Sequence, residues 1–201
     1  MVSSSFKPAV NRVIEPIART AVRLRITPDM VTLTGTIGSI ASSLYLIPRG
    51  ELFLASLVIS FFLLSDLFDG AIARLSERGP TQWGGFLDST CDRLSDAALL
   101  ASLAIYCILN EDPLYPAILV VIVLGFLVSY IRAKSESYGV ACTVGVAERT
   151  ERLLIAIFAI GFEGLGLPYS LSVGIWALLI LSSVTVIQRV IVVRRGLAQN
   201  G

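Results

Sequence analysis

Long apolar stretches recur along almost the whole chain and constrain its fold more than any other feature. A helix needs about 20 residues to cross the hydrocarbon core of a membrane, and several segments reach or approach that length. The six expected spans are residues 30–48, 52–75, 86–109, 113–134, 148–163 and 169–190. The chain is 55% hydrophobic and 15% charged, and its mean hydropathy is +0.79. We therefore expect an all-α integral membrane fold, forming one domain over residues 1–201, and we exclude a soluble enzyme, a disordered chain and a nucleic-acid-binding protein.

The segment before the first span, residues 6–25, has the pattern of an amphipathic helix. Its apolar residues recur at helical spacing with arginines between them, which is typical of a basic helix that lies in the membrane interface. Packing of the same apolar face on the rest of the protein is the alternative, and the two are compatible. Charged residues interrupt every apolar run in this segment, so a signal peptide is not expected.

Basic residues are distributed unevenly between the two sides of this six-span arrangement. One side takes 15 of the 16 Lys and Arg residues, and the other side takes only Arg49. Cytoplasmic loops of membrane proteins carry an excess of Lys and Arg, so both termini and the loops after the second and fourth spans are expected to be cytoplasmic. We expect a multi-pass protein of the plasma membrane whose active site lies on the cytoplasmic side.

Aspartates are concentrated in or beside two of the expected spans, where they are costly. A carboxylate at the centre of a membrane helix costs roughly 2.5–3.5 kcal/mol on insertion scales. Helical spacing places Asp66 and Asp69 on one face of their helix, and Asp88, Asp92 and Asp96 on one face of the next helix. Ion pairing with neighbouring arginines is the alternative, but it leaves too many carboxylates without a counter-charge.

Two opposed carboxylate faces would bring several oxygen atoms together, and the chain contains no histidine to neutralise them. Oxygen ligands suit hard ions such as Mg²⁺, with Mn²⁺ as the alternative. A pair of such ions activates an attacking oxygen and stabilises a leaving one. The aspartate pattern therefore predicts a site for two divalent cations.

The aspartates belong to a longer motif, which reads SDLFDGAIAR at residues 65–74 and GGFLDSTCD at residues 84–92. This motif resembles the signature of the CDP-alcohol phosphotransferases. It departs from that signature by one extra residue in the loop between Arg74 and Gly84, where insertions are tolerated. Members of that family are six-helix membrane enzymes, commonly homodimers, that transfer a phosphatidyl group from a CDP-linked lipid to an alcohol and release CMP.

The resemblance implies a role for each residue of the motif. The residues that would hold two Mg²⁺ ions are Asp66, Asp69, Asp88 and Asp92. Asp92 would also be the catalytic general base that takes the proton of the acceptor hydroxyl. The residues that would bind the CDP-lipid are Asp29, Met30, Val31, Thr32, Gly70, Arg74, Thr81 and Gly84. For the stretch that begins at Asp29, a plain helix start is the alternative, because Pro28 and Asp29 suit a first helical turn.

A second polar cluster bears on which alcohol is accepted. Its members are Ser129, Arg132, Lys134, Arg149, Arg152 and Arg189. An acceptor that carries a phosphate would need such a basic site, whereas free inositol or glycerol would not. Cytoplasmic anchoring is the alternative, although it explains Arg149 and Arg152 less well because glutamates alternate with them. These segments also resemble the actinobacterial phosphatidylinositol phosphate synthases, which usually have lysine where this chain has Arg132. That resemblance implies inositol 1-phosphate as acceptor and CDP-diacylglycerol as donor.

Other functions remain open at the level of sequence. Glycerol 3-phosphate as acceptor would give a phosphatidylglycerophosphate synthase, and an ether-linked lipid could replace the diacyl donor. A transporter could also place carboxylates in membrane helices, but neither inverted repeats nor broken helices are evident. A structural subunit would use the aspartates only as ion-pair partners.

Overall fold

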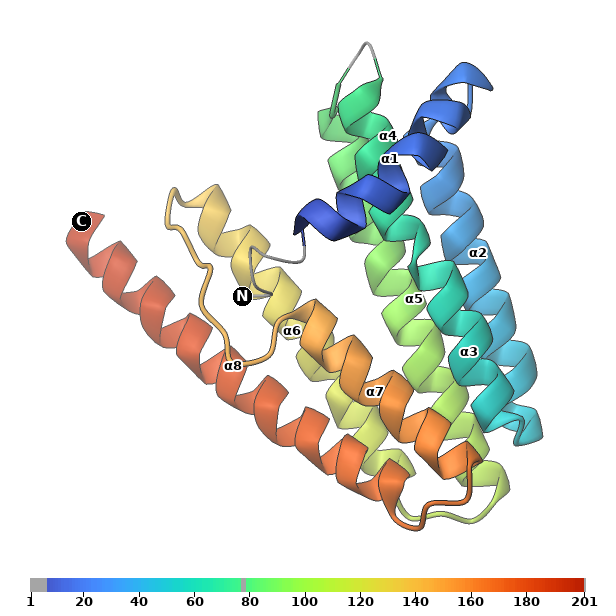
Figure 1. The fold of residues 1–201 in the computed structure, drawn as a ribbon. Coiled ribbons are helices and arrows are strands. Elements are labelled where there is room, and N and C mark those ends of the chain that lie inside the picture. Colours follow the sequence, from blue (N-terminus) through green and yellow to red (C-terminus); the bar gives the residue numbers. More distant parts are fainter. Residues whose placement is uncertain (1–6, 77–78, 201) are drawn as a thin grey trace. The chain divides into compact units, whose positions relative to one another are not determined.

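The computed structural model describes residues 7–76 and 79–200, with the side chains of residues 15–65, 68–76 and 79–198. Helices dominate this part of the chain, and it contains no strand. The helices are α1 (Lys7–Arg23), α2 (Pro28–Leu46), η1 (Ile47–Arg49), α3 (Leu52–Leu63), α4 (Ser65–Leu75), α5 (Gln82–Leu109), α6 (Tyr115–Ser137), α7 (Arg149–Gly164) and α8 (Ser170–Asn200) (Figure 1). The expectation of an all-α fold is confirmed for these residues.

Within the described residues, four helical segments are long and apolar enough to cross a membrane. They are Pro28–Arg49, Leu52–Leu75, Tyr115–Ser137 and Ser170–Ala198. The other two expected spans are also helical, as α5 and α7. However, α5 carries Asp88, Asp92, Arg93 and Asp96 between its start and its middle, and α7 is only 16 residues long. The expected count of six spans therefore stays a prediction.

The chain divides into two compact units. Unit 1 comprises Met1–Ser42 and Val58–Ser95, and unit 2 comprises Ser43–Leu57 and Asp96–Gly201. In unit 1, α1 lies across α4 (Figure 1). A small core of Ala18, Ala71 and Ile72 joins these two helices, so α4, which carries part of the aspartate motif, is held from outside by α1.

Helix α1 divides its apolar residues between two directions. Ala18 is fully buried in the small core that it forms with Ala71 and Ile72 of α4, and Ala21 and Val22 pack on the same core. Ile17 and Leu24 remain 51% and 68% exposed. Packing on the protein therefore accounts for one side of the helix, while the exposed apolar side chains are those that an interfacial position would use.

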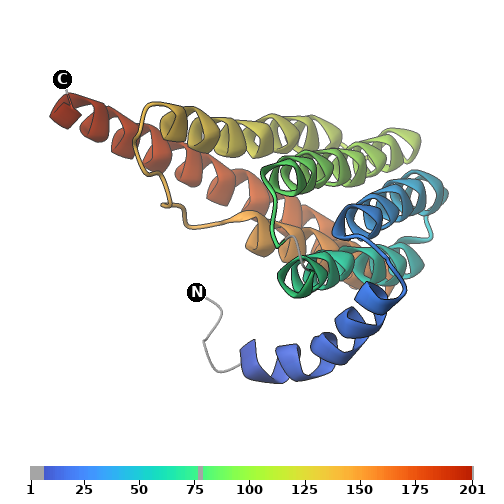
Figure 2. The ribbon, with the colours of Figure 1, turned by 90° about the horizontal axis from the view of Figure 1, so that it is seen from above.

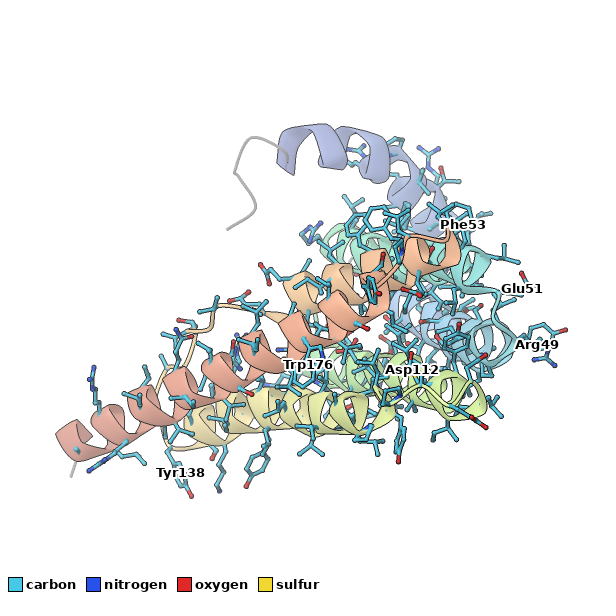
Figure 3. All side chains as sticks on the ribbon, turned by 90° about the horizontal axis from the view of Figure 1, so that it is seen from below. Arg49, Glu51, Phe53, Asp112, Tyr138 and Trp176 are labelled. Carbon is cyan, nitrogen blue, oxygen red and sulfur yellow. The ribbon has the colours of Figure 1, made fainter. Side chains whose placement is uncertain are left out.

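In unit 2, α8 runs along both α6 and α7 (Figures 1 and 2). Close approach of α7 and α8 depends on Gly174, because a Cβ atom there would overlap the Cβ of Ala159. Arg49 and Glu51 lie at one end of this unit, and Tyr138, which follows α6, lies at the opposite end (Figure 3). The short connection between α2 and α3 and the C-terminal end of α6 are thus far apart along the unit.

Candidate active site

A pocket of about 1000 Å³ opens in unit 1, where the beginnings of α2 and α5 meet α4. Six of the eight residues predicted to bind the CDP-lipid line it, namely Asp29, Thr32, Gly70, Arg74, Thr81 and Gly84. Two of the predicted metal ligands, Asp69 and Asp88, line the same pocket. The structure therefore brings most of the motif together around one cavity. Met30 is 54% exposed and Val31 packs beside the small core, and neither is among the lining residues.

Helix starts form much of the pocket wall. Helix α2 begins at Pro28, with Asp29 in its first turn, and the Thr27 hydroxyl accepts a hydrogen bond from the Met30 amide at 3.3 Å. Helix α5 starts in a similar way, because the Thr81 hydroxyl accepts from the Gly84 amide at 3.0 Å. The helix-start interpretation of this stretch is confirmed, and Asp29 lines the pocket as well. Amide groups at helix starts also favour negatively charged ligands such as phosphates.

Gly84 of α5 lies beside Asp29 of α2 at the pocket. A Cβ atom there would lie 3.2 Å from the Thr81 hydroxyl oxygen and 3.7 Å from Oδ1 of Asp29. The absence of a side chain therefore keeps two polar groups exposed to the same space. At Gly70 a Cβ atom would lie 3.6 Å from Nη1 of Arg74, an ordinary contact. Its role would be to leave room for a ligand beside that guanidinium group.

Asp69 is the best-defined carboxylate of the site. It is 7% exposed, and its Oδ2 accepts a hydrogen bond from the Thr32 hydroxyl at 2.5 Å. The bond joins α2 to α4 across 37 residues of sequence. A hydroxyl donor of this kind fixes the rotamer of a carboxylate. Thr32, which is expected to contact the CDP-lipid, lines the pocket and also contacts Asp69.

The structure describes only some of the side chains of the predicted metal site. The side chain of Asp66 lies outside the described residues, and among the described side chains no three metal-binding groups come together. Asp88 and Asp92 lie one helical turn apart on α5, whereas Asp69 lies on α4. These donors are all carboxylate oxygens, which fit Mg²⁺ or Mn²⁺. The ligand set therefore stays a prediction that the residue chemistry supports.

Two of the predicted acceptor-binding arginines are buried in unit 2. Arg189 is 3% exposed, and it donates from Nε to the Val144 carbonyl at 2.9 Å and from Nη1 to the Val128 carbonyl at 2.5 Å. Arg152 is 8% exposed and donates from Nη1 to the Ala147 carbonyl at 3.2 Å. Backbone carbonyls thus hold both guanidinium groups in place, and guanidinium groups are the side chains best suited to bind a phosphate.

Among the remaining members of the basic cluster, Arg149 has its partner on another helix, and the others have theirs on or just beyond their own helix. Arg149 pairs with Asp96, its Nε lying 3.3 Å from Oδ1, and both side chains are about one quarter exposed or less. This pair gives Asp96 a partner that its spacing in the sequence did not indicate. The others are contacted locally: Arg132 by Glu136 at 3.0 Å, Lys134 by the Tyr138 ring at 4.5 Å, and Ser129 by the Gly125 carbonyl at 3.2 Å.

Several residues that line the pocket were not predicted from the sequence. They include Arg25, Ile26, Thr27, Ser76, Gly79 and Pro80. Arg25 adopts a left-handed backbone conformation, with φ of 59°, in the turn between α1 and α2. In the sequence, the one signal that could have indicated Arg25 as a pocket residue is its position two residues before Thr27, Pro28 and Asp29, where α2 begins. Arg25 adds positive charge to a cavity that already holds Arg74, which suits a pyrophosphate.

Comparison with known proteins decides the family. The family model for CDP-alcohol phosphatidyltransferases matches residues 25–195, which include the basic cluster and every lining residue of the pocket except Val22. The chain belongs to this family. It is 40% identical over 193 residues to the phosphatidylinositol phosphate synthase of Mycolicibacterium smegmatis, covering 94% of this chain and 86% of the relative. It is 41% identical over 197 residues to the phosphatidylinositol phosphate synthase of Streptomyces avermitilis, covering 94% of this chain and 80% of that relative.

Solved structures agree with this assignment. The crystal structure of Mycobacterium tuberculosis phosphatidylinositol phosphate synthase with CDP-DAG bound matches with a TM-score of 0.85 and 40% identity, covering 90% of this chain and 94% of that one. A structure of the same enzyme in complex with manganese and citrate matches with a TM-score of 0.85, covering 90% and 88%. In the part of the chain that the structure describes, this protein is all-helical, and several of its helices are long and apolar enough to span a membrane.

Proposed function

We propose that this protein transfers the phosphatidyl group of CDP-diacylglycerol to inositol 1-phosphate, forming phosphatidylinositol phosphate and CMP. The observation that carries the proposal is the 40% identity, over most of the chain, to proteins named phosphatidylinositol phosphate synthase. The bound CDP-DAG in the related structure supports the donor, and the buried Arg152 and Arg189 support an acceptor that carries a phosphate.

The pocket in unit 1 is proposed to bind the donor. Asp29, Thr81 and Gly84 would receive the cytidine end, while Arg74 and the helix starts would hold the pyrophosphate. Met30, Val31, Thr32 and Gly70 complete the proposed CDP-lipid site. Its lining therefore combines polar groups for a nucleotide with positive charge for phosphates.

Two Mg²⁺ ions, or Mn²⁺ ions, are proposed as the cofactors, and the related structure with manganese and citrate supports a divalent cation. Asp66, Asp69, Asp88 and Asp92 would hold them, and such ions supply charge stabilisation at the pyrophosphate. Asp92 accepts the proton of the acceptor hydroxyl. The hydroxyl oxygen forms a bond to the lipid-linked phosphorus as the bond from that phosphorus to the CMP oxygen breaks.

The acceptor phosphate is proposed to bind the basic cluster. Arg152 and Arg189 are already buried and held by backbone carbonyls, so they would bind a phosphate with little loss of side-chain entropy. Ser129 lies next to Val128, whose carbonyl Arg189 contacts. Arg132, Lys134 and Arg149 would add charge at the rim, where Arg149 exchanges Asp96 for the phosphate.

The membrane arrangement is part of the same proposal. It comprises six spans in one domain, an interfacial α1, both termini and the active site on the cytoplasmic side of the plasma membrane, and a homodimer. The exposed Ile17 and Leu24 support the interfacial position of α1. Four apolar helices support a multi-pass protein, and α5 and α7 would be the two spans that enclose polar groups.

The test is CMP release by the purified protein with CDP-diacylglycerol and Mg²⁺. Inositol 1-phosphate, free inositol and glycerol 3-phosphate are compared as acceptors, and Asp92→Asn is assayed in parallel. We expect release only with inositol 1-phosphate, and a loss of at least about 100-fold in kcat for Asp92→Asn, as for other general bases. Release with glycerol 3-phosphate alone would instead identify a phosphatidylglycerophosphate synthase. Full turnover by Asp92→Asn would overturn the assigned base.

A further inference from the structure

Helix α8 holds the connection between α6 and α7 through side chains rather than through apolar contacts alone. The Gln188 side-chain oxygen accepts from the Val146 amide at 3.1 Å. The Thr185 hydroxyl accepts from the Ala147 amide at 3.2 Å. Arg189, one turn beyond Thr185, donates to the Val144 carbonyl. Three α8 residues on one face thus bind backbone groups of Val144, Val146 and Ala147.

Thr185 occupies the centre of this arrangement, and its hydroxyl serves both as a donor and as an acceptor. Its hydroxyl donates to the Leu181 carbonyl of its own helix at 2.8 Å and accepts from Ala147. Both Thr185 and Ala147 are fully buried. The Ala147 amide therefore depends on this one oxygen, because a buried amide without a partner costs about 1–3 kcal/mol.

The approach of the connection to α8 is also close. A Cβ atom on Gly145 would lie 2.7 Å from Cγ2 of Thr185 and 3.8 Å from Nε of Arg189. Gly145 has a φ of +156°. Glycine at this position therefore lets the backbone reach the Thr185 side chain, and the threonine methyl group limits how far the connection can shift.

The same backbone segment leads directly into the basic cluster. The carbonyl of Ala147 accepts from Nη1 of Arg152, and Arg149 opens α7 two residues later. Ala147 is thus held by Thr185 through its amide while it holds Arg152 through its carbonyl. A displacement of Ala147 would therefore shift the Arg152 guanidinium group relative to Arg189, whose own position is set by Val144 and Val128.

We propose that Thr185 and Gln188 are positioning residues that set the acceptor site, by fixing residues 146 and 147 and through them Arg152. Neither side chain touches the substrate. The inference rests on the proposed function, since it takes the acceptor phosphate to bind Arg152 and Arg189. It adds that the affinity for this phosphate depends on two polar side chains of α8 that belong to no basic cluster and to no metal motif.

The test separates KM for inositol 1-phosphate from KM for CDP-diacylglycerol and from kcat. Thr185→Val keeps the shape but removes the acceptor for Ala147, so KM for inositol 1-phosphate is expected to rise about tenfold. KM for CDP-diacylglycerol is expected to stay within about twofold. Thr185→Ser retains the hydroxyl and should restore the wild-type value. Gln188→Met should raise the same KM. Because Gln188 is less buried than Thr185, this variant provides the test if Thr185→Val does not fold.

Ser183→Ala is the matched control on the same helix, because that hydroxyl donates to the Leu179 carbonyl of its own helix. It should behave like the wild type. An unchanged KM for inositol 1-phosphate in both Thr185→Val and Gln188→Met would overturn the positioning role, as would an equal rise in both KM values. Absence of turnover with inositol 1-phosphate in the wild type would instead reject the proposed function, and the inference with it.

Discussion

Asp69 illustrates, at the scale of a single residue, how the site can hold a charge inside a membrane protein. Its carboxylate is nearly buried and receives the Thr32 hydroxyl from a different helix. A buried carboxylate with a fixed rotamer is ready to bind a cation, because it loses little entropy when the ion arrives. The motif predicts the carboxylate, but Thr32 and Asp69 are separated by 37 residues, so only the fold reveals that they are partners.

Replacing Thr32 by valine is expected to weaken metal binding. Thr32→Val keeps the volume but removes the hydroxyl that orients Asp69, and loss of such a supporting hydrogen bond typically lowers metal affinity by roughly 10–100-fold. The measurement is a Mn²⁺ titration by electron paramagnetic resonance without CDP-diacylglycerol, so that turnover plays no part. Thr34→Val is the control, since the exposed Thr34 hydroxyl donates to the Met30 carbonyl of its own helix. Equal affinity in the two variants would contradict the role assigned to Thr32.

Packing of α8 against α7 decides the geometry of unit 2 at the scale of whole helices. Ile160 on α7 and Ile175 and Leu178 on α8 are almost completely buried. The two helices approach closely because Gly174 presents no side chain to Ala159. In a membrane, where apolar burial gives little drive for helix association, small residues at such contacts supply much of the packing energy. The basic cluster therefore depends on a contact near the other end of the same helices.

Gly174→Ala is expected to destabilise unit 2. Its Cβ would overlap that of Ala159, which cannot rotate away, and overpacking of this kind costs about 1–3 kcal/mol. The measurement is the midpoint temperature of thermal unfolding in detergent, and we expect this midpoint to be lower than that of the wild type. Gly125→Ala on α6 is the matched control, because a Cβ there meets nothing within 4 Å and alanine favours a helix more than glycine does. Its midpoint should equal or exceed that of the wild type. A midpoint that stays unchanged for Gly174→Ala would argue against the close contact.

At the scale of the whole molecule, the lengths of the apolar stretches predicted where the helices lie, but they did not predict where every helix begins and ends. The segment expected at 148–163 appears as Arg149–Gly164. Helix α5 begins at Gln82 rather than near residue 86, since Thr81 caps it and Gly84 and Gly85 lie inside it. Helix α8 continues to Asn200, beyond the expected end at 190. Charge patterns did not reveal the pairing of Arg149 with Asp96 or the carbonyl partners of Arg189, because the residues that form these contacts are distant in sequence.

The proposed orientation across the membrane can be tested at two exposed positions of unit 2. Glu51 lies between α2 and α3, and Tyr138 follows α6 at the opposite end of the unit (Figure 3). Because basic residues accumulate on the proposed cytoplasmic side, Tyr138 should face the cytoplasm and Glu51 the outside. We introduce Glu51→Cys or Tyr138→Cys into a background in which Cys91, Cys107 and Cys142 are replaced, and treat spheroplasts with a membrane-impermeant maleimide. Glu51→Cys should be labelled in intact spheroplasts, and Tyr138→Cys only after lysis. The reverse pattern would invert the orientation, and labelling of both before lysis would show that the two ends do not lie on opposite sides of a membrane.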